Sequence, residues 1–539
     1  MAVTIVAFEH EEFCALVGVR MGLEEVEAKV SMMGAAPEGV QGTLQRFDIN
    51  PNRPDWLSIE GIVRAFRGFL GIETGLPKYE VKPSGIALEV DASVRDVRPI
   101  GVGAILREVG LTEASLKSLI ELQENLHLTL GRRRKKVAIG IHDAEKVVPP
   151  FVYKAVPPTS VAFVPLGMAR SMDLAAIVRQ HEKGLEYGPI LAGKDRYPII
   201  LDARGVVLSF PPIINGIATQ LASETRTLFV DVTGTDAEAV ETALNVICVA
   251  LADRGARIES VELRTPEGTR PTPDLTPRTN SLNVRAANEL LGLSLTADEV
   301  AECLRRLRHG AEPAGGEVRV HTPRYRADIM HPVDLIEDVA IGYGYDKVPL
   351  SPPRRQTAGE PTALGEFTEG LRTLLVGYGY LEAMSLAVAP PTEPFESPPR
   401  LAIVNPVTPE NARIRSSLLP SLLALLALNK HRDLPQRVFQ VGEVVRGTTN
   451  VCLLSAVSLH ARAGFTEAKS LAQGLLRDVG KGFEIEAAED PNFIDGRCAS
   501  VRIDDAQVGH FGELHPRVVT GYDLAHPAAA LEFEVAPLA

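Results

Sequence analysis

Two proline-rich segments divide the 539-residue chain and restrict it to a multidomain fold. Residues 271–277 contain three prolines, and residues 351–355 contain two. Proline has no backbone N–H and a fixed φ, so it is excluded from helix interiors and from the middle of a sheet. We therefore interpret both segments as linkers. At roughly one domain per 150 residues, a chain of this length is expected to hold three or four domains.

The pattern between the linkers predicts a multidomain α+β protein. Antiparallel strands with helices packed on one side are expected in the last part of the chain, where we predict a strand at 401–404 and a leucine-rich helix at 414–428. The expected domains are 1–85, 86–268, 273–350 and 356–539. Within them, helices are expected to begin at Ser58, at Asp236 and at the capping box of Thr296 with Glu299.

Composition narrows the class of protein. The formal net charge of -13 argues against a general nucleic-acid binder, although a local basic patch is still compatible with RNA contact. Residues 132–136 are such a patch, and they are either a phosphate contact or a solvated loop. The five cysteines are scattered, and no apolar run approaches the roughly 20 residues of a membrane helix. We expect a cytoplasmic protein without a membrane segment.

The segment 328–338 is strongly acidic and begins a helix. Pro332 suits the first helical position, and Asp334, Glu337 and Asp338 then fall at spacings that share one face. Asp328 lies just upstream. Clustered carboxylates repel one another unless a divalent cation or a basic partner joins them. The alternative is that these acids complement the helix dipole.

Polar residues also end several apolar strands of the second domain. Ser209, Asp231 and Thr233 are in such positions, and alternation places Asp231 and Thr233 on one side of a strand. His142 stands beside Asp143, but neighbouring residues on a strand face opposite ways. The chain has no phosphate-binding glycine loop and no nucleophile elbow. The residues alone therefore predict an acidic cluster and a polar cleft, but no reaction.

Several longer motifs, taken in order, carry a resemblance that covers essentially the whole chain. They include Asn-Pro-Asn-Arg-Pro-Asp at 50–55, Val-Ala-Ile-Gly-Ile-His-Asp at 137–143, Asp-Val-Thr-Gly-Thr-Asp at 231–236, the acidic segment up to Tyr345, and Gly-Glu-Leu-His-Pro at 512–516. With these motifs the chain resembles the β subunit of phenylalanine–tRNA ligase, of the shorter archaeal and eukaryotic type.

The resemblance implies an α2β2 heterotetramer that uses ATP to attach phenylalanine to tRNA(Phe), with the synthetic site in the α subunit. It makes 1–85 a B1-like domain, 86–268 a B3/B4-like editing domain, 273–350 a B5-like domain, and 356–539 a degenerate class II synthetase-like core. The chain lacks the Phe-Arg-x-Glu strand and the glycine-rich arginine strand that bind ATP in active class II cores.

The resemblance also implies site residues. Hydrolysis of tyrosine wrongly attached to tRNA(Phe) is expected to use Asp231, Thr233 and Ser209, with Ile200 in the substrate pocket. Mg²⁺, shared with the α subunit, is expected at Asp328, Asp334, Glu337 and Asp338.

Two other functions are alternatives: a non-catalytic RNA-binding scaffold, and a free-standing hydrolase that clears mischarged tRNA. Co-expression with an α subunit separates these hypotheses: a stable complex that attaches phenylalanine supports the synthetase, and hydrolysis by the chain alone supports the free-standing hydrolase.

Overall fold

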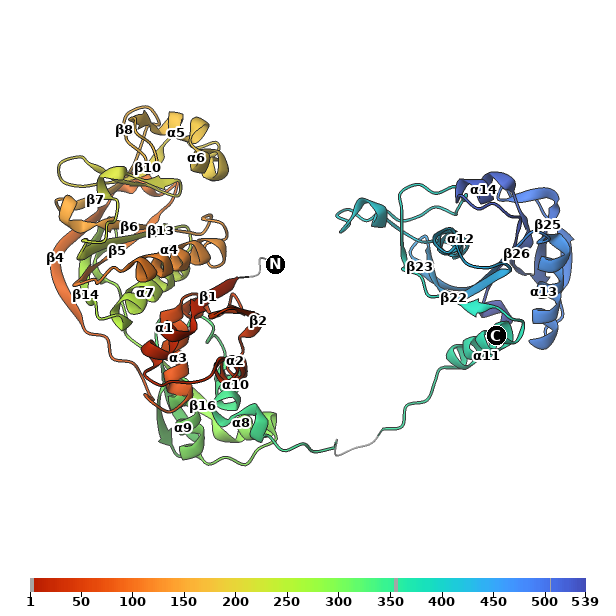
Figure 1. The fold of residues 1–539 in the computed structure, drawn as a ribbon, viewed down its shortest axis with the longest axis horizontal. Helices are drawn as coiled ribbons and strands as arrows, with labels where there is room; N and C mark the ends of the chain where they lie inside the picture. Colours follow the sequence, from red (N-terminus) through yellow and green to blue (C-terminus); the bar gives the residue numbers. More distant parts are fainter. Residues whose placement is uncertain (1–3, 353–356, 505) are drawn as a thin grey trace. The chain divides into compact units, whose positions relative to one another are not determined.

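The computed structural model describes the chain except residues 1–3, 353–356 and 505 (Figure 1). It divides the chain into two compact units, Met1–Ser351 and Pro352–Ala539. Of the second predicted linker, 351–355, residues 353–355 lie outside the described residues. In the first unit one continuous apolar core extends from Val6 to Ile341, so the three domains expected there share packed side chains. No helix among the described residues is long and apolar enough to cross a membrane.

The first unit begins with a small three-stranded sheet in the order β1-β3-β2 (Ile5–Glu9, Leu44–Asp48, Ala36–Gln41). Its helices are α1 (His10–Val17), α2 (Leu23–Met32) and α3 (Ile59–Phe69). Helix α3 begins as the sequence predicts, because the Ser58 side chain accepts a hydrogen bond from the Gly61 N–H. This helix is buried along almost its whole length.

A ten-stranded sheet forms the centre of the first unit. Its order is β12-β11-β10-β7-β4-β14-β5-β13-β6, with β15 beside β14. The bounds are β4 Val81–Val90, β5 Ile100–Arg107, β6 Val137–Asp143, β7 Phe151–Val156, β10 Tyr197–Leu201, β11 Val207–Phe210, β12 Ile214–Asn215, β13 Thr227–Gly234, β14 Arg257–Thr265 and β15 Gly268–Thr272.

Helices pack against this sheet, and a small lobe is attached near one end of it. The buried helix α7 (Ala237–Asp253) begins at the Asp236 cap, as predicted, and α4 (Glu113–Leu128) leads into β6. A small lobe adds β8 (Ala162–Phe163), β9 (Met172–Asp173), α5 (Leu174–Gln180) and α6 (Glu182–Tyr187) near β10 (Figure 1).

The prediction of a linker at 271–277 is partly wrong, because Pro271 and Thr272 belong to strand β15. Within the described part of the chain, strand β15 pairs only with β14, where Pro271 faces Glu262. Proline is tolerated on a strand with one neighbour, because the missing N–H has no ladder partner to lose. The buried Thr272 hydroxyl donates to the Gly103 carbonyl oxygen at 2.7 Å. The start of this segment is therefore tied to the large sheet.

The first unit ends with a second three-stranded sheet, β16-β18-β17 (Arg278–Asn283, Glu317–Thr322, Gly310–Ala314). Helices α8 (Val284–Leu291), α9 (Ala297–Arg306) and α10 (Pro332–Tyr343) accompany it. The predicted capping box of Thr296 with Glu299 begins α9, and Pro332 is the first residue of α10. Both helix starts are confirmed.

The second unit is a seven-stranded sheet in the order β19-β22-β23-β27-β26-β25-β24. All neighbouring pairs are antiparallel except β19 with β22. The strands are β19 Leu381–Glu382, β22 Gln436–Arg446, β23 Thr449–Leu459, β24 Glu484–Ala487, β25 Phe493–Ile503, β26 Ala506–Leu514 and β27 Ala528–Glu534. The helices are α11 (Ala363–Gly377), α12 (Leu419–Leu428), α13 (Phe465–Asp478) and α14 (Pro516–Gly521).

Two predictions for this unit are wrong in detail. The leucine-rich helix begins at Leu419, not at residue 414, and residues Arg413–Ile414 form the short strand β21. Pro420 explains the shift, because proline is favoured in the first turn of a helix and disrupts its interior. The strand expected at 401–404 is reduced to a single bridge between Ala402 and Arg413.

Candidate functional site

A cavity of about 290 Å³, lined by apolar and polar side chains, lies beside strands β6 and β13 of the large sheet. Ser209, Asp231 and Thr233 all line it, together with residues of helix α4 and of the segment 211–215. Asp231 and Thr233 are two residues apart on β13, so strand alternation places both side chains on the cavity side. The structure thus brings three of the four predicted editing residues into one site.

Asp231 is held by a histidine on the neighbouring strand. His142 Nε2 lies 2.7 Å from Asp231 Oδ2, and both side chains are almost fully buried. His142 Nδ1 lies 2.8 Å from the Thr219 hydroxyl, which itself donates to the Gly216 carbonyl oxygen. We infer that Nδ1–H donates to Thr219, so one further proton is shared between Nε2 and Asp231. Among the described residues, the other carboxylate oxygen of Asp231 has no hydrogen-bond partner.

Gly140 leaves room for this histidine–aspartate pair. A Cβ at Gly140 would lie 2.0 Å from Asp231 Oδ2 and 2.6 Å from His142 Nε2. Gly140 lies opposite Asp231 in the β6–β13 ladder. The pairing of the two strands therefore holds the Gly140 backbone close to the Asp231 side chain. We expect Gly140→Ala to separate the pair and to lower the free energy of unfolding by roughly 1–3 kcal/mol, as overpacking of a core does.

The matched control is Gly110→Ala, because a Cβ there meets nothing within 4 Å. Urea unfolding of both variants is the measurement. A Gly140→Ala protein that unfolds at the wild-type urea concentration would show that the pair does not need this close approach.

Thr233 is oriented by a buried arginine. Arg98 Nε–H donates to Thr233 Oγ1 at 3.0 Å, and its NH2 group donates to the Thr233 carbonyl oxygen at 2.7 Å. Burial lowers the pKa of Arg98 to about 10, so the guanidinium still carries its charge at neutral pH. Because the hydroxyl oxygen already accepts from Arg98, the hydroxyl proton of Thr233 is available to a group in the cavity.

Ser209 and Ile200 have different positions. The Ser209 hydroxyl donates to Asn215 Oδ1 at 3.2 Å, and both residues line the cavity. Ile200 pairs with Ser209 across β10 and β11, but its side chain is part of the main apolar core and does not line the cavity. The structure does not bring Ile200 to the other three residues, and its predicted contact with substrate stays a prediction.

Charged side chains also line the cavity. Arg134 lines it and is held by Glu124 at 2.8 Å, by the Ile213 carbonyl oxygen, and by the ring of Tyr187. Burial alone would raise the pKa of Glu124, but the hydrogen bond from His127 and the charge of Arg134 outweigh it and lower this pKa to about 2. Glu124 is therefore ionised and keeps Arg134 in place at neutral pH.

Sequence reasoning missed His142 and Arg98. The partner of His142 is not its neighbour Asp143 but Asp231, 89 positions away. Arg98 is 135 positions from Thr233. The polar residues within the apolar stretch 137–143 were the available signal, but the register that pairs them with β13 cannot be read from one sequence.

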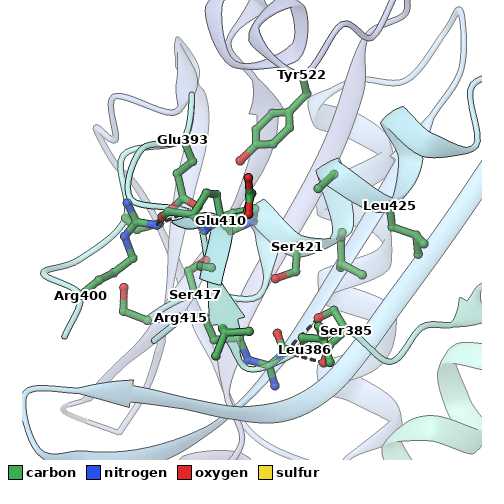
Figure 2. A pocket seen from close by; sticks show the side chains of 18 of the residues that line it. Ser385, Leu386, Glu393, Arg400, Glu410, Arg415, Ser417, Ser421, Leu425 and Tyr522 are labelled. Carbon is green, nitrogen blue, oxygen red and sulfur yellow. Dashed lines mark hydrogen bonds and ion pairs between the residues drawn. The ribbon is translucent and has the colours of Figure 1, made fainter. Parts of the chain in front are cut away.

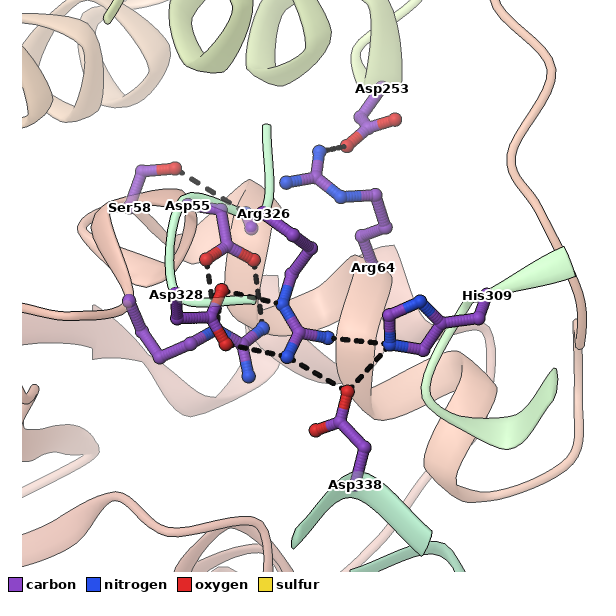
Figure 3. A network of polar contacts seen from close by, with 10 residues as sticks. Asp55, Ser58, Arg64, Asp253, His309, Arg326, Asp328 and Asp338 are labelled. Atoms are coloured by element: carbon purple, nitrogen blue, oxygen red, sulfur yellow. Dashed lines mark hydrogen bonds and ion pairs between the residues drawn. The ribbon is translucent and has the colours of Figure 1, made fainter. Parts of the chain in front are cut away.

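The acidic helix α10 does not present its carboxylates together. Asp338 is buried and accepts from His309 Nε2 at 2.6 Å and from Arg326 at 2.9 Å (Figure 3). Asp328 forms a two-point ion pair with the same Arg326 at 2.8 and 2.6 Å. Asp334 instead accepts the N–H groups of Met330 and His331 at the helix start.

Glu337 is exposed and makes no ion pair or side-chain hydrogen bond within the part of the chain that the structure describes. The carboxylates of α10 thus share one face only in part, because Glu337 is exposed to solvent whereas Asp338 is buried.

This arrangement does not fit a metal site built by the chain alone. Among the described residues, no three His, Cys, Asp or Glu side chains are grouped so that they could hold an ion. The charges of Arg326 and Arg53 lower the pKa of Asp328, and Arg326 and His309 lower that of Asp338, in each case against the effect of burial. Both acids are therefore neutralised internally. The Mg²⁺ site stays a prediction that the geometry of this chain does not favour.

The second unit has its own cavity, of about 620 Å³ and mostly apolar (Figure 2). Arg415 lines it, but its guanidinium donates to the Ser385 hydroxyl and to the carbonyl oxygens of Ser385, Leu386 and Glu443. Arg400 is paired with Glu393 at 3.1 Å. The two arginines of this cavity are thus committed to internal partners, and neither is placed to bind a phosphate.

Comparison with known proteins identifies parts of the chain. The profile of the phenylalanyl tRNA synthetase beta chain CLM domain matches residues 348–535, and that of the tRNA synthetase B5 domain matches residues 281–345. The second match includes the acidic helix α10.

Full-length relatives and a solved structure agree with these matches. The phenylalanine–tRNA ligase beta subunit of Methanothrix thermoacetophila is 42% identical, over 98% of this chain and 99% of the relative. That of Archaeoglobus fulgidus is 41% identical, over 98% of both chains. An N-terminal fragment of the phenylalanyl-tRNA synthetase beta subunit from Pyrococcus horikoshii is 40% identical, with a TM-score of 0.61, over 63% of this chain and 99% of the fragment.

Proposed function

The chain belongs to the family of phenylalanine–tRNA ligase β subunits, and we propose that in this tRNA-charging enzyme it hydrolyses tRNA(Phe) mischarged with tyrosine. The observation that carries the proposal is the convergence of Ser209, Asp231 and Thr233 on one cavity beside the buried His142. The test is to add preformed Tyr-tRNA(Phe) to the assembled enzyme and to follow the release of free tyrosine.

Tyrosine differs from phenylalanine by one hydroxyl, which an apolar synthetic pocket rejects weakly. A second site that hydrogen-bonds this hydroxyl discriminates much better, because the substrate without it leaves a buried polar group unpaired. The unpartnered carboxylate oxygen of Asp231 is such an acceptor, and the phenol O–H is the matching donor. Asp231 therefore selects tyrosine and protects correctly charged tRNA.

Hydrolysis needs a water molecule that attacks the ester carbonyl carbon, a bond that breaks between this carbon and the ribose oxygen, and a proton that reaches the departing ribose oxygen. The Thr233 hydroxyl, with its oxygen already accepting from Arg98, is set to donate to the ester carbonyl oxygen. The charge of Arg98 also lies close to the oxygen that becomes negative, which favours the transition state. Ser209 lines the same wall and is available to position the water.

Docking to an α subunit is supported by exposed apolar side chains on the second unit. Met384, Leu386 and Leu428 line its apolar cavity and are 95%, 71% and 78% exposed. Val404 and Val407 are each 97% exposed. Apolar side chains in such number mark a protein–protein surface, and the family name of β subunit implies a partner. We propose that this surface binds the α subunit, and that the assembly is an α2β2 heterotetramer.

The remaining family expectations are proposals of the same kind. Mg²⁺ at α10 would need ligands from water or from the α subunit, because Asp328 and Asp338 already pair with Arg326. Metal analysis of the assembled enzyme tests this. ATP is a substrate of the complex, and a cytoplasmic location follows from the need for tRNA and ATP.

We expect the β chain alone to form no phenylalanyl adenylate. Arg437 of strand β22 pairs with Glu467, Arg446 pairs with Glu534, and Arg415 binds carbonyl oxygens, so these cations are already used. ATP–pyrophosphate exchange with phenylalanine is the measurement. The assembled enzyme is the positive control, and exchange by the purified β chain, free of α subunit, would contradict the expectation.

A further inference from the structure

Three of the five cations in the basic turn between α4 and β6, residues 132–136, have no internal partner among the described residues. Arg132, Arg133 and Lys135 are exposed, and within the described residues their side chains form no ion pair and no hydrogen bond. The chain as a whole has a net charge of -13, so a cluster of exposed, unpaired cations contrasts with its overall negative charge. Three neighbouring cations without a carboxylate partner form a local positive patch that is available to an anionic ligand.

The backbone of this turn is strained. Arg132, Arg133 and Arg134 have φ values of 47°, 53° and 63°, so three consecutive non-glycine residues occupy the left-handed region. This conformation is costly for residues with a Cβ, and runs of it are rare. Strain of this kind persists where the surrounding structure imposes it, and it is concentrated at functional sites.

Arg98 imposes the shape of the turn and links it to the cavity. Its NH1 group donates to the carbonyl oxygens of Arg134 and Lys135 at 3.2 Å each, while Nε and NH2 hold Thr233. Arg98 is 2% exposed and has no carboxylate partner among the described residues. One guanidinium thus fixes the position of the basic turn relative to the hydroxyl that faces the substrate.

We propose that Arg132, Arg133 and Lys135 bind the phosphodiester backbone of the 3′ end of the mischarged tRNA. The inference rests on the proposed editing function and assigns its RNA-binding surface. The tyrosyl ester is carried by the terminal ribose, so the last phosphates of the strand lie near the ester when it reaches Thr233. Guanidinium groups match phosphate oxygens in a two-point geometry, and the side chain of Arg134 already lines the cavity.

The test is the triple variant Arg132→Ala, Arg133→Ala, Lys135→Ala in the assembled enzyme. With Tyr-tRNA(Phe) we expect KM for deacylation to rise at least about 10-fold, with kcat within about twofold of wild type. The slope of log KM against log salt concentration should fall by about 2, as expected for three lost phosphate contacts on a single strand. Lys82→Ala is the control, because Lys82 is an exposed cation of the same sheet, paired with Glu80.

A second substrate separates phosphate binding from cavity shape. 3′-O-tyrosyl-adenosine carries the ester but no phosphodiester backbone, so the triple variant should hydrolyse it like wild type. An equal KM increase with both substrates would overturn the proposal, as would an unchanged KM and salt slope with Tyr-tRNA(Phe).

Binding of a single-stranded oligoribonucleotide tests the surface without hydrolysis. If wild type hydrolyses neither ester, the proposed function fails, but weaker binding of the oligoribonucleotide by the triple variant still supports the RNA surface. Equal binding by both proteins would overturn it, and would leave an acidic protein partner as the ligand of this patch.

Discussion

Replacing Asp231 with asparagine is expected to lower the rate of Tyr-tRNA(Phe) hydrolysis by the assembled enzyme at least about 100-fold. Asparagine preserves the size of the side chain but removes the charge that His142 Nε2 approaches at 2.7 Å, and it weakens the acceptor offered to the phenol. The rate of phenylalanine attachment should not change, because we propose that the synthetic site belongs to the α subunit. Tyr-tRNA(Phe) should then accumulate when tyrosine is in excess.

The matched control for this variant is Asp143→Asn. Asp143 is also buried and lies next to His142, but it bonds to Thr225 and Lys146 and does not line the cavity. The Asp143→Asn variant should hydrolyse Tyr-tRNA(Phe) at the wild-type rate. If Asp231→Asn hydrolyses mischarged tRNA at the wild-type rate, Asp231 does not select the phenol.

A second large effect is expected at Arg326, whose replacement by methionine should lower the free energy of unfolding by about 3–5 kcal/mol. Its guanidinium is 2% exposed and pairs with both Asp328 and Asp338 (Figure 3). Methionine fills much of the space but leaves two buried carboxylates without their main cation. Breaking a buried pair on one side costs more than the pair contributes, because the remaining charge is uncompensated.

Acid should act on the same network. The pKa values of Asp328 and Asp338 are lower in the folded protein than the value of about 3.9 for an unfolded chain. Their contribution to stability is therefore fully present above that value and is lost as the pH falls below it. The difference in stability between wild type and Arg326→Met should shrink in the same pH range.

Urea unfolding of the full chain measures this effect, with Arg285→Met as the control. Arg285 is 87% exposed and, among the described residues, pairs only with Glu289, so its loss should change stability by less than about 0.5 kcal/mol. A small effect of Arg326→Met, together with a wild-type unfolding midpoint that rises with Mg²⁺ concentration, would contradict the internal network and favour a bound ion at these acids.

Local signals in the sequence predicted the helix starts well. Ser58, Asp236, Thr296 and Pro332 each begin the expected helix, because capping depends on side chains within three or four residues. The late start of α12 at Leu419 follows the same chemistry, since Pro420 marked the first turn.

Contacts between distant segments were predictable only in part. Strand alternation placed Asp231 and Thr233 on one side, but the partners His142 and Arg98 depend on the pairing of β6 and β13 and on the fold of the sheet. For the acidic segment, the sequence correctly predicted a helix that begins at Pro332. The spacing of its carboxylates does not show which of them face the core. Arg326 stood two residues before Asp328, and its role follows from its burial, which the sequence does not give.

We propose that the cavity beside β6 and β13 selects tyrosine on tRNA(Phe). Single-turnover hydrolysis of Tyr-tRNA(Phe) and of Phe-tRNA(Phe) by the wild-type assembled enzyme, under identical conditions, measures this selectivity. We expect the tyrosyl ester to be hydrolysed at least about 100-fold faster, because only tyrosine supplies a donor to Asp231. Equal rates for the two esters, or no hydrolysis of either, would contradict the claim.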